Sequence, residues 1–266
     1  RELTLVLPTK ISNYFRTLEV KTLTDKTSSE GIARFGLERK LDLWKKPRKV
    51  FKTLRQLTRE KDQLVEERTM LLNFRHAEQA EAEPNKDSLE RIEDRIALID
   101  QQEKEVKAAI TKLIKTDTGV ARSVKLLMTI PGVGELTAAI TLAETNGFEL
   151  IRNKRQLVSY AGLDVKEKQS GTSVKGKPKI SKRGNKHLRK AMHMPALTAI
   201  KHNEKMKAKY AHLVGRHGIK MKAAVAIQRK LLELIYTIFK TQQPFDKHYQ
   251  QTPQVNQPAL NKLERS

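Results

Sequence analysis

Two of the serines in a glycine-containing segment that is crowded with cations are candidate nucleophiles. Ser170 is followed by Gly171, and Ser181 is followed by Lys182 and Arg183. A serine hydroxyl is a weak nucleophile until neighbouring groups stabilise its alkoxide form, and nearby cations can do so while they hold a phosphate. Most serines in such loops only form turns, so from the residues alone both interpretations stay open.

The segment that holds both serines, residues 151–190, carries a large excess of positive charge. It contains 13 Lys and Arg residues against two acidic residues, which gives a net charge of +11. A solvated charged face normally mixes both signs. A surface for the phosphate backbone needs cations, because the counterions that they displace dominate the affinity. We therefore predict a loop that contacts DNA through Lys175, Lys177, Lys179, Lys182, Arg183 and Arg189.

A second phosphate-binding pattern lies upstream, in the run Pro131-Gly132-Val133-Gly134-Glu135. The apolar residues before Pro131 predict one helix, and the small residues after Glu135 predict another. Gly132 and Gly134 permit a tight turn and let the backbone approach a phosphate, which the N–H groups of the second helix would face. This pattern is typical of a helix-hairpin-helix motif. The alternative is a plain junction between two packed helices.

The composition of the whole chain favours the same class of partner. Its 266 residues carry a net charge of +23, and such a charge favours a polyanionic partner because like charges repel in the compact state. The absence of cysteine excludes disulfides, cysteine nucleophiles and cysteine-bound zinc or iron–sulfur sites. No apolar run approaches the roughly 18 residues that a membrane span needs, so we expect no membrane partner.

Residues 48–118 predict a long helical hairpin. This stretch has no glycine and a single proline, Pro84, and its second half holds apolar residues spaced alternately three and four apart, as in a coiled coil. The predicted seam comprises Leu89, Ile92, Ile96, Ile99, Glu103, Val106, Ile110 and Leu113. Two helices of about 45–50 Å, folded back near Pro84, would form a spacer or an oligomerisation arm.

Taken together, these segments resemble the IS110 family of insertion-sequence transposases (IS116/IS110/IS902 type). The motifs that carry the resemblance, in order, are Pro131–Gly134, Tyr160–Leu163, Gln169–Gly171, Ser181–Asn185 with Leu188-Arg189, and the helix Ala223–Lys240. The resemblance implies an N-terminal RuvC-like (RNase H-like) α/β domain with a DEDD acidic set, a coiled-coil insertion and a C-terminal transposase domain. It also implies a guide RNA and a catalytic serine, which it places at Ser170, with Ser181 as the second choice.

The N-terminal part of the family pattern is incomplete in this chain. Thr24-Asp25-Lys26-Thr27 resembles the family's T-D-K-x-D-(A/S) motif, which implies that Asp25 is a catalytic metal ligand for Mg²⁺. Ser28 stands where the motif has its second aspartate, and the family's first aspartate and its glutamate would lie upstream of Arg1. One carboxylate does not hold a metal clamp on a phosphate. We therefore expect an N-terminally truncated transposase, in which a predicted strand, Leu3–Leu7, belongs to a larger domain. Without the missing acidic residues, this copy of the transposase would be inactive.

The sequence thus predicts a mainly α protein in four parts. Residues 1–46 would be the remnant of the RuvC-like domain, residues 47–118 the coiled-coil hairpin, residues 119–249 the transposase domain with the helix-hairpin-helix, and residues 250–266 a disordered tail. The predicted function is an RNA-guided DNA transposase or recombinase, cytoplasmic and nucleoid-associated in a bacterium, that works as a homodimer or homotetramer. The alternative is a non-enzymatic nucleic-acid-binding protein that uses the same helix-hairpin-helix and basic segment.

Overall fold

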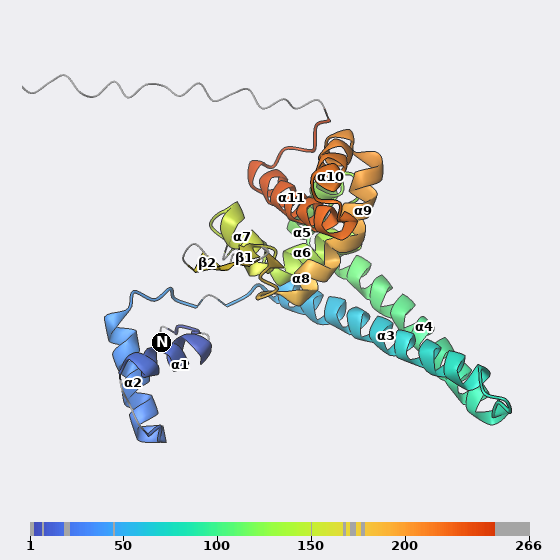
Figure 1. The fold of residues 1–266 in the computed structure, drawn as a ribbon, viewed down its shortest axis with the longest axis horizontal. Coiled ribbons are helices and arrows are strands. Elements are labelled where there is room, and N and C mark those ends of the chain that lie inside the picture. The colour runs from blue at the N-terminus through green and yellow to red at the C-terminus, as the bar shows by residue number, and fades with distance from the viewer. Residues whose placement is uncertain are drawn as a thin grey trace, which may run out of the picture. The chain divides into compact units, whose positions relative to one another are not determined.

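The protein is mainly helical, as predicted. The computed structural model describes residues 3–6, 8–18, 22–44, 46–149, 151–166, 169–170, 174–176 and 179–247, so the tail predicted over 250–266 lies outside the described residues. The chain forms two compact units, Arg1–Arg48 and Lys49–Ser266 (Figure 1). No helix in the described part is long and apolar enough to cross a membrane.

The first unit contains two helices, α1 (Pro8–Thr17) and α2 (Asp25–Glu38). Tyr14 and Phe35 are buried between them, with ring centroids 5.1 Å apart in an edge-to-face arrangement, a geometry that suits aromatic quadrupoles. The Tyr14 hydroxyl also donates a 2.7 Å hydrogen bond to Glu38. These contacts fix how α1 packs on α2.

The strand predicted at the start of the chain is not formed over its described residues, Leu3–Val6, which have no regular secondary structure. The Leu3 carbonyl accepts one hydrogen bond from the Trp44 N–H, but a strand requires a ladder of such bonds. Pro8 then opens α1 directly, because its fixed φ suits the first position of a helix. Apolar residues alone therefore gave the wrong element here.

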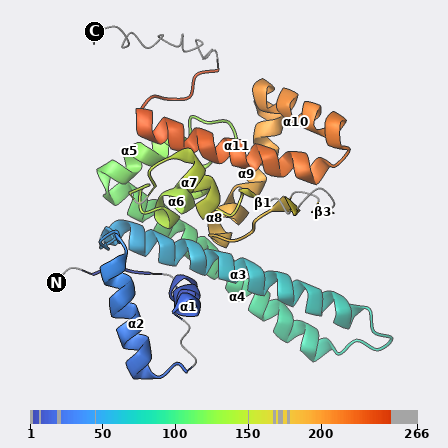
Figure 2. The same ribbon diagram turned by 60° about the vertical axis from the view of Figure 1, so that its left-hand side comes forward.

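The second unit begins with the helical hairpin, which consists of α3 (Lys49–Gln79) and α4 (Lys86–Thr116). Each helix has 31 residues, or about 46 Å at 1.5 Å per residue, and the two run antiparallel (Figure 2). Asn85 caps α4 by accepting a 3.0 Å hydrogen bond from the Ser88 N–H, which satisfies one orphan donor of the first turn. Two long helices thus occupy the range over which the sequence predicts the hairpin.

The predicted seam of α4 is also the face that packs on α3. Ile99, Val106 and Ile110 are buried there. Its polar member, Glu103, is 6% exposed and makes ion pairs with cations of both helices: Lys61, Arg68 and Lys107. The hydrogen bond from Lys107 opposes the cost of burial and lowers the pKa of Glu103. This carboxylate is therefore buried in its charged form with its partners present, as a buried charge requires.

The remaining helices pack on the base of the hairpin as one helical body. They are α5 (Thr118–Leu127), α6 (Glu135–Glu144), α7 (Lys154–Tyr160), α8 (Lys186–Ala191), α9 (His193–His202), α10 (Glu204–His217) and α11 (Lys220–Thr241). The longest of them, α11, buries an apolar face that includes Ile227, Leu231 and Ile235. A single hydrophobic cluster runs from Leu54 of α3 through Leu142 of α6 to this face, so the hairpin base and the helical body share one core.

Two short antiparallel ladders lie within the basic segment. The strand β1 (Val165–Lys166) pairs with β4 (Lys179–Ile180), and β2 (Gln169–Ser170) pairs with β3 (Val174–Lys175). Together with α7 and α8, they replace much of the irregular loop that the sequence predicted over residues 151–190. Asn153 and Asn185 start the two helices by capping them, a role in which asparagine is strongly favoured.

Candidate nucleic-acid interface

A basic groove of about 400 Å³ lies between α8, the start of α9 and α11. Six basic side chains line it: Lys182, Lys186, His187, Arg189, Lys190 and His193. The remaining lining residues are Glu66, Ile180, Val225 and Gln228, so one carboxylate faces six basic groups. A concave surface with one dominant sign of charge concentrates oppositely charged ligands, and this groove therefore suits phosphates.

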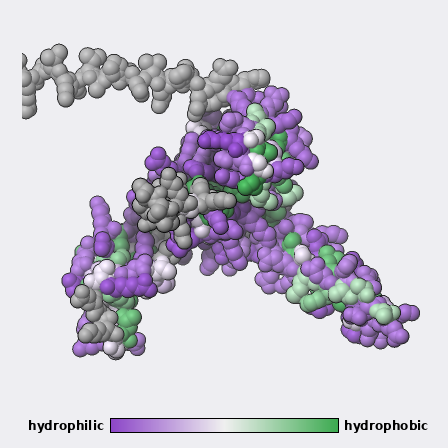
Figure 3. Space-filling model, viewed as in Figure 1, coloured by the Kyte–Doolittle hydropathy of each residue, from purple (hydrophilic) through white to green (hydrophobic). Residues whose placement is uncertain are grey.

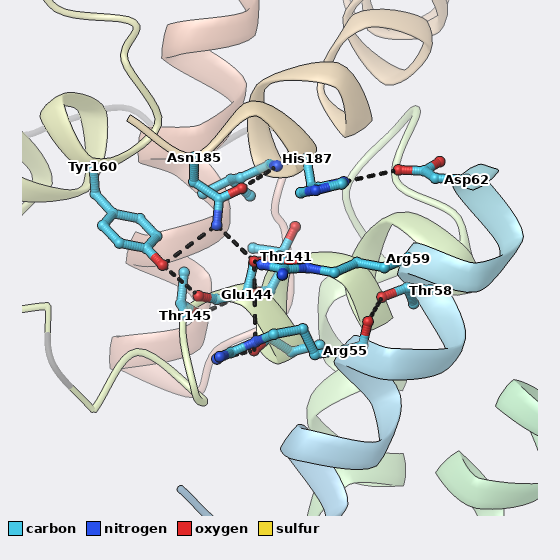
Figure 4. A network of polar contacts seen from close by, with 12 residues as sticks. Arg55, Thr58, Arg59, Asp62, Thr141, Glu144, Thr145, Tyr160, Asn185 and His187 are labelled. Carbon is cyan, nitrogen blue, oxygen red and sulfur yellow. Dashed lines mark hydrogen bonds and ion pairs between the residues drawn. The ribbon is translucent and has the colours of Figure 1, made fainter. Parts of the chain in front are cut away.

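A buried carboxylate lies beneath the start of α8, as Figure 4 shows. Glu144, the last residue of α6, is only 2% exposed. Its two oxygens accept hydrogen bonds from Arg59 at 2.9 and 3.0 Å, and Asn185 donates to one of them at 2.6 Å. The backbone carbonyl of Glu144 accepts from the Tyr160 hydroxyl at 2.9 Å. Groups from α3, α6, α7 and the start of α8 thus meet at one residue.

Glu144 is buried as a carboxylate rather than as a neutral acid. Burial by itself raises its pKa, but the hydrogen bonds from Arg59 and Asn185 and the charges of Arg59 and Arg55 outweigh that effect and lower the pKa. Arg55 lies 4.0 Å from the carboxylate and donates two hydrogen bonds to the Ala143 carbonyl. The site therefore depends on a buried charge whose partners belong to the hairpin.

Asn185 connects this carboxylate to the groove. Its Oδ1 accepts a 2.9 Å hydrogen bond from the Leu188 N–H and so caps α8, while its Nδ2 donates to Glu144. Before it, Gly184 has φ of +151°, and a Cβ there would collide with the Tyr160 carbonyl oxygen. The close approach at Gly184 and the anchored Asn185 fix where α8 begins and hence where its cations point.

The side chains of α8 are also tied to the hairpin on the other side. His187 Nδ1 lies 3.3 Å from Asp62, and Lys190 Nζ lies 3.0 Å from Glu66. The hydrogen bond from Lys190 lowers the pKa of Glu66. Lys190 is therefore already paired, whereas Lys186 makes no ion pair within the described part of the chain.

Some of the cations predicted to contact DNA lie together in the groove, and others lie elsewhere or have a second structural role. Lys182 and Arg189 both line the groove, and Arg183 is exposed beside them. One nitrogen of Arg189 donates a 2.8 Å hydrogen bond to the Ala161 carbonyl, so this side chain also supports the turn after α7. Lys179 is exposed in β4.

The other two predicted DNA contacts are Lys175 and Lys177. Lys175 belongs to β3 by its backbone, in a ladder with Gln169. Lys177 lies outside the described residues.

The two candidate nucleophiles are placed differently. Ser170 ends β2 and is the register partner of Val174 in β3. Ser181 follows β4, where its hydroxyl donates a 2.5 Å hydrogen bond to Asp164 and accepts one of 3.3 Å from the Arg183 N–H. A serine that stabilises a turn makes hydrogen bonds of this kind. They favour the interpretation of Ser181 as a turn former over its interpretation as a nucleophile.

The predicted helix-hairpin-helix glycines lie in the connection between α5 and α6, which spans residues 128–134. Gly132 has φ of +94°, and a Cβ there would lie 2.5 Å from the Pro195 carbonyl oxygen of α9. The lack of a side chain at Gly132 therefore lets the turn adopt a positive φ and pack closely on α9. Gly134 is exposed and is the N-cap of α6, with no side-chain capping bond. Of the two glycines, Gly134 is the one whose surroundings leave room for a phosphate.

Asp25 is the first residue of α2 and is exposed. It belongs to the first unit, whereas the groove and Ser170 belong to the second. The described residues contain no group of three or more His, Asp or Glu side chains that could hold a metal ion. A single carboxylate does not fit the Mg²⁺ clamp implied by the family resemblance, so we derive no step through a metal.

Several residues that line the groove, or that hold α8 in place beside it, were not predicted from the sequence to be functional. Glu144, Asn185, Lys186, His187 and His193 belong to this group. Glu144 carried one sequence signal, because it is the one charged residue between Leu136 and Asn146, in a run of small and apolar residues. A lone charge at the end of a buried helix usually has a partner.

The fold and the groove define a basic, mainly helical protein with a concave surface suited to polyanions. The family model "Transposase IS116/IS110/IS902 family" matches residues 124–211, which include the groove's α8 and most of α10. The pilin gene-inverting proteins of Moraxella bovis and Moraxella lacunata are each 29% identical over 251 residues, covering 92% of this chain and 75% of theirs. An uncharacterised 43.6 kDa protein of insertion element IS110 from Streptomyces coelicolor is 27% identical over 115 residues, 43% of this chain and 28% of its own length.

These similarities support an IS110-family transposase, and the family model itself matches residues 124–211. A transposase of this type acts in DNA recombination and binds DNA. The family predicted from the sequence motifs is thus confirmed.

Proposed function

We propose that the chain is a DNA recombinase that holds the phosphate backbone in the basic groove and breaks a strand with Ser170. The observation that carries the proposal is the groove itself, in which six basic groups converge within the family-matched segment. The names of the Moraxella relatives, which refer to inversion of a pilin gene, support recombination between two DNA sites as the overall reaction.

In the proposed reaction, the Ser170 oxygen attacks a phosphorus of the DNA backbone. The serine gives up its proton, a bond forms between its oxygen and the phosphorus, and the bond to one deoxyribose oxygen breaks. That deoxyribose oxygen takes up a proton and leaves as a hydroxyl, while the protein stays joined to the other strand end. Attack by a hydroxyl of another strand reverses these steps and joins the strands in a new order.

The groove would hold the DNA during these steps. Lys182 and Lys186 are exposed cations of the groove, and neither makes an ion pair within the described part of the chain. The exposed N-terminus of α6 at Gly134 adds N–H groups that favour an anion. We further propose that the surplus of basic residues also binds a structured guide RNA, because RNA and DNA present the same phosphate charge.

A first test is the salt dependence of binding. If about six phosphates are neutralised, the logarithm of the association constant should fall against the logarithm of salt with a slope near −5. The double variant Lys182→Gln/Lys186→Gln removes two groove cations and should flatten the slope by about 2. Fluorescence anisotropy with a short duplex at several salt concentrations measures both values.

The matched control for the groove is Lys104→Gln/Lys112→Gln, which removes two exposed cations of α4. It should leave the slope within about one unit of the wild type. A wild-type slope flatter than about −2 would exclude a multi-phosphate surface, and equal effects of the two double variants would exclude the groove as its location.

A second test concerns self-association, which we propose occurs through the outer face of the hairpin. Ile96 and Ile99 of the predicted seam pack inside the hairpin, so they are not free for a second copy. Phe74 and Leu98 are each 54% exposed, and hydrophobic side chains appear along the hairpin surface in Figure 3. Exposed apolar groups on a charged helical arm favour an interface between copies.

The variant Phe74→Asp/Leu98→Asp should therefore convert an oligomer into a monomer in light scattering at tens of micromolar, with little change in helix content. The control Lys86→Asp/Glu90→Lys changes exposed charged residues of α4 and should leave the oligomer intact. A wild type that is already monomeric, with and without DNA, would contradict the proposal and leave the hairpin as a spacer.

A further inference from the structure

A second strongly basic surface lies outside the groove, at the end of α9, along α10 and at the start of α11. Residues 201–222 contain seven Lys and Arg residues and three histidines, and their one acidic residue is Glu204. The seven Lys and Arg residues are all exposed. Figures 1 and 2 both show α10 on the side of the helical body away from the hairpin. In Figure 3, hydrophilic residues cover most of that end of the body.

Four of the basic side chains form a straight row on α10. Lys205, Lys209, His212 and Arg216 follow one another at intervals of four, three and four residues, which places them on one face of an α-helix. The row extends over twelve residues, and its first and last Cα positions are about 16 Å apart along the helix axis. We call it the α10 row. All four of its members are exposed.

The face of α10 beside the row, about 100° round the helix, packs on its neighbours and fixes the row in place. Met206 is buried, Tyr210 packs against the core from the same side, and Gly218 ends the helix in a left-handed conformation. The short connection at Gly218 and Ile219 leads directly into α11. The α10 row is therefore carried by a rigid helix corner rather than by a loose loop.

Acidic residues are scarce at this corner, where Glu204 is the one acid among residues 201–222. Cations of the hairpin such as Arg59 and Arg68 are matched by Glu144, Asp100 and Glu103. Within the described part of the chain, Lys209 and Arg216 make no ion pair. Partial desolvation and the nearby charges of Lys222, Arg216 and His212 lower the pKa of His217, as expected where cations crowd together.

We propose that the α10 row is a second DNA-binding surface, which holds a segment of duplex DNA separate from the segment in the groove. An α-helix fits the major groove of B-form DNA, about 12 Å wide, whereas the major groove of an RNA duplex is too deep and narrow for it. A row of about 16 Å follows several phosphates, since B-form DNA carries one charge per roughly 1.7 Å of its axis. The inference concerns binding alone and stands or falls independently of the serine chemistry.

The test compares two triple variants that remove the same charge from the full chain. Lys205→Gln/Lys209→Gln/Arg216→Gln neutralises the α10 row, and Lys86→Gln/Arg91→Gln/Arg95→Gln neutralises three exposed cations of α4. Binding to a 30-base-pair duplex DNA, and to an RNA duplex of the same sequence, is measured over a series of salt concentrations. A third variant, Lys205→Arg/Lys209→Arg/Arg216→Lys, keeps the charges.

The row variant should weaken DNA binding at least about tenfold and flatten the salt slope by roughly 2–3, because each lost phosphate contact removes about one unit. The α4 variant and the charge-keeping variant should stay within about twofold of the wild type, and RNA-duplex binding should change much less than DNA binding. Equal effects of the two neutralised triples would overturn the proposal, and equal losses on RNA and DNA would overturn the assignment to DNA. The Lys182→Gln/Lys186→Gln groove variant, measured in parallel, separates a failure of the α10 row from a failure of the groove.

Discussion

A Ser170→Ala variant should form no covalent protein–DNA adduct while it still binds DNA. The hydroxyl is the atom that joins the phosphorus in the proposed reaction, so its loss should reduce adduct formation by more than about a thousandfold, as removal of a nucleophile does in other enzymes. DNA binding should change by less than about 1 kcal/mol, because one neutral hydroxyl adds little beside many charged contacts. Denaturing gels of the protein with labelled duplex fragments and Mg²⁺ give the adduct yield.

Ser181→Ala is the matched control for this experiment. Its hydroxyl is engaged with Asp164 in a turn, and its loss should leave the adduct in place. Both variants are made in a longer version of the protein that carries the remaining acids of the family motif together with Ser28→Asp. The chain with Asp25 alone should form little or no adduct, because a single carboxylate does not position the metal clamp. An adduct that survives Ser170→Ala and disappears in Ser181→Ala would move the nucleophile to the second serine.

The second large effect is expected at Glu144. Changing it to Gln keeps the size of the side chain but leaves Arg59 and Arg55 without the buried charge that they face. Breaking one side of a buried ion pair typically costs about 3–5 kcal/mol, so we expect a loss of that order in the free energy of unfolding. Urea denaturation followed by circular dichroism measures it. The control Glu105→Gln, on the exposed face of α4, should change stability by less than about 0.5 kcal/mol.

The difference in unfolding free energy between the wild type and Glu144→Gln should depend on pH. This dependence separates the contribution of the carboxylate charge from that of the side chain's shape. The pKa of Glu144 is lowered in the folded protein, so its contribution is complete above the unfolded value, near 4.5, and is lost as the pH falls through the folded value. The gap between wild type and Glu144→Gln should therefore narrow as the pH is lowered below about 4.5. A gap that stays constant over this range would show that the carboxylate charge does not stabilise the fold.

The same variant should weaken DNA binding, because Asn185 would lose the carboxylate that anchors the start of α8. A double variant that also carries Asn185→Ala should lose less than the sum of the two single losses, since the two residues share one contact, while the cap that Asn185 gives to α8 is an additional loss. Additive losses would mean that Asn185 positions α8 without Glu144.

The long hairpin could be predicted from the sequence because its information is local and periodic. A seam repeated over Leu89–Leu113 constrains the face of α4, and its polar member, Glu103, was visible as an exception before its partners were known. The strand predicted at Leu3–Leu7 was wrong over its described residues because a short apolar run does not distinguish a strand from other packed segments.

The groove could be predicted only in part. The charge of residues 151–190 indicated a phosphate surface, but its geometry depends on contacts between residues far apart in the chain. Asn185 meets Glu144 across 41 positions, and Arg59 meets it across 85. The role of a single side chain is harder to predict, as Arg189 shows. The sequence predicted that it contacts a phosphate, and in the structure it also donates a hydrogen bond to the Ala161 carbonyl. Charge composition identifies a surface, and tertiary contacts decide which cations face it.

The most direct test of the serine mechanism is to identify the residue that carries DNA. An adduct trapped with duplex DNA is digested with nuclease and trypsin, and the peptide that holds a nucleotide remnant is identified by mass spectrometry. Trypsin cleaves after Lys168, Lys175 and Lys179, so Ser170 and Ser181 fall in different peptides. We expect the remnant on Ser170 in the peptide Gln169–Lys175 and its absence from the Ser170→Ala protein. A remnant on Ser181, or no nucleotide-bearing peptide from an active preparation, would contradict the proposed mechanism.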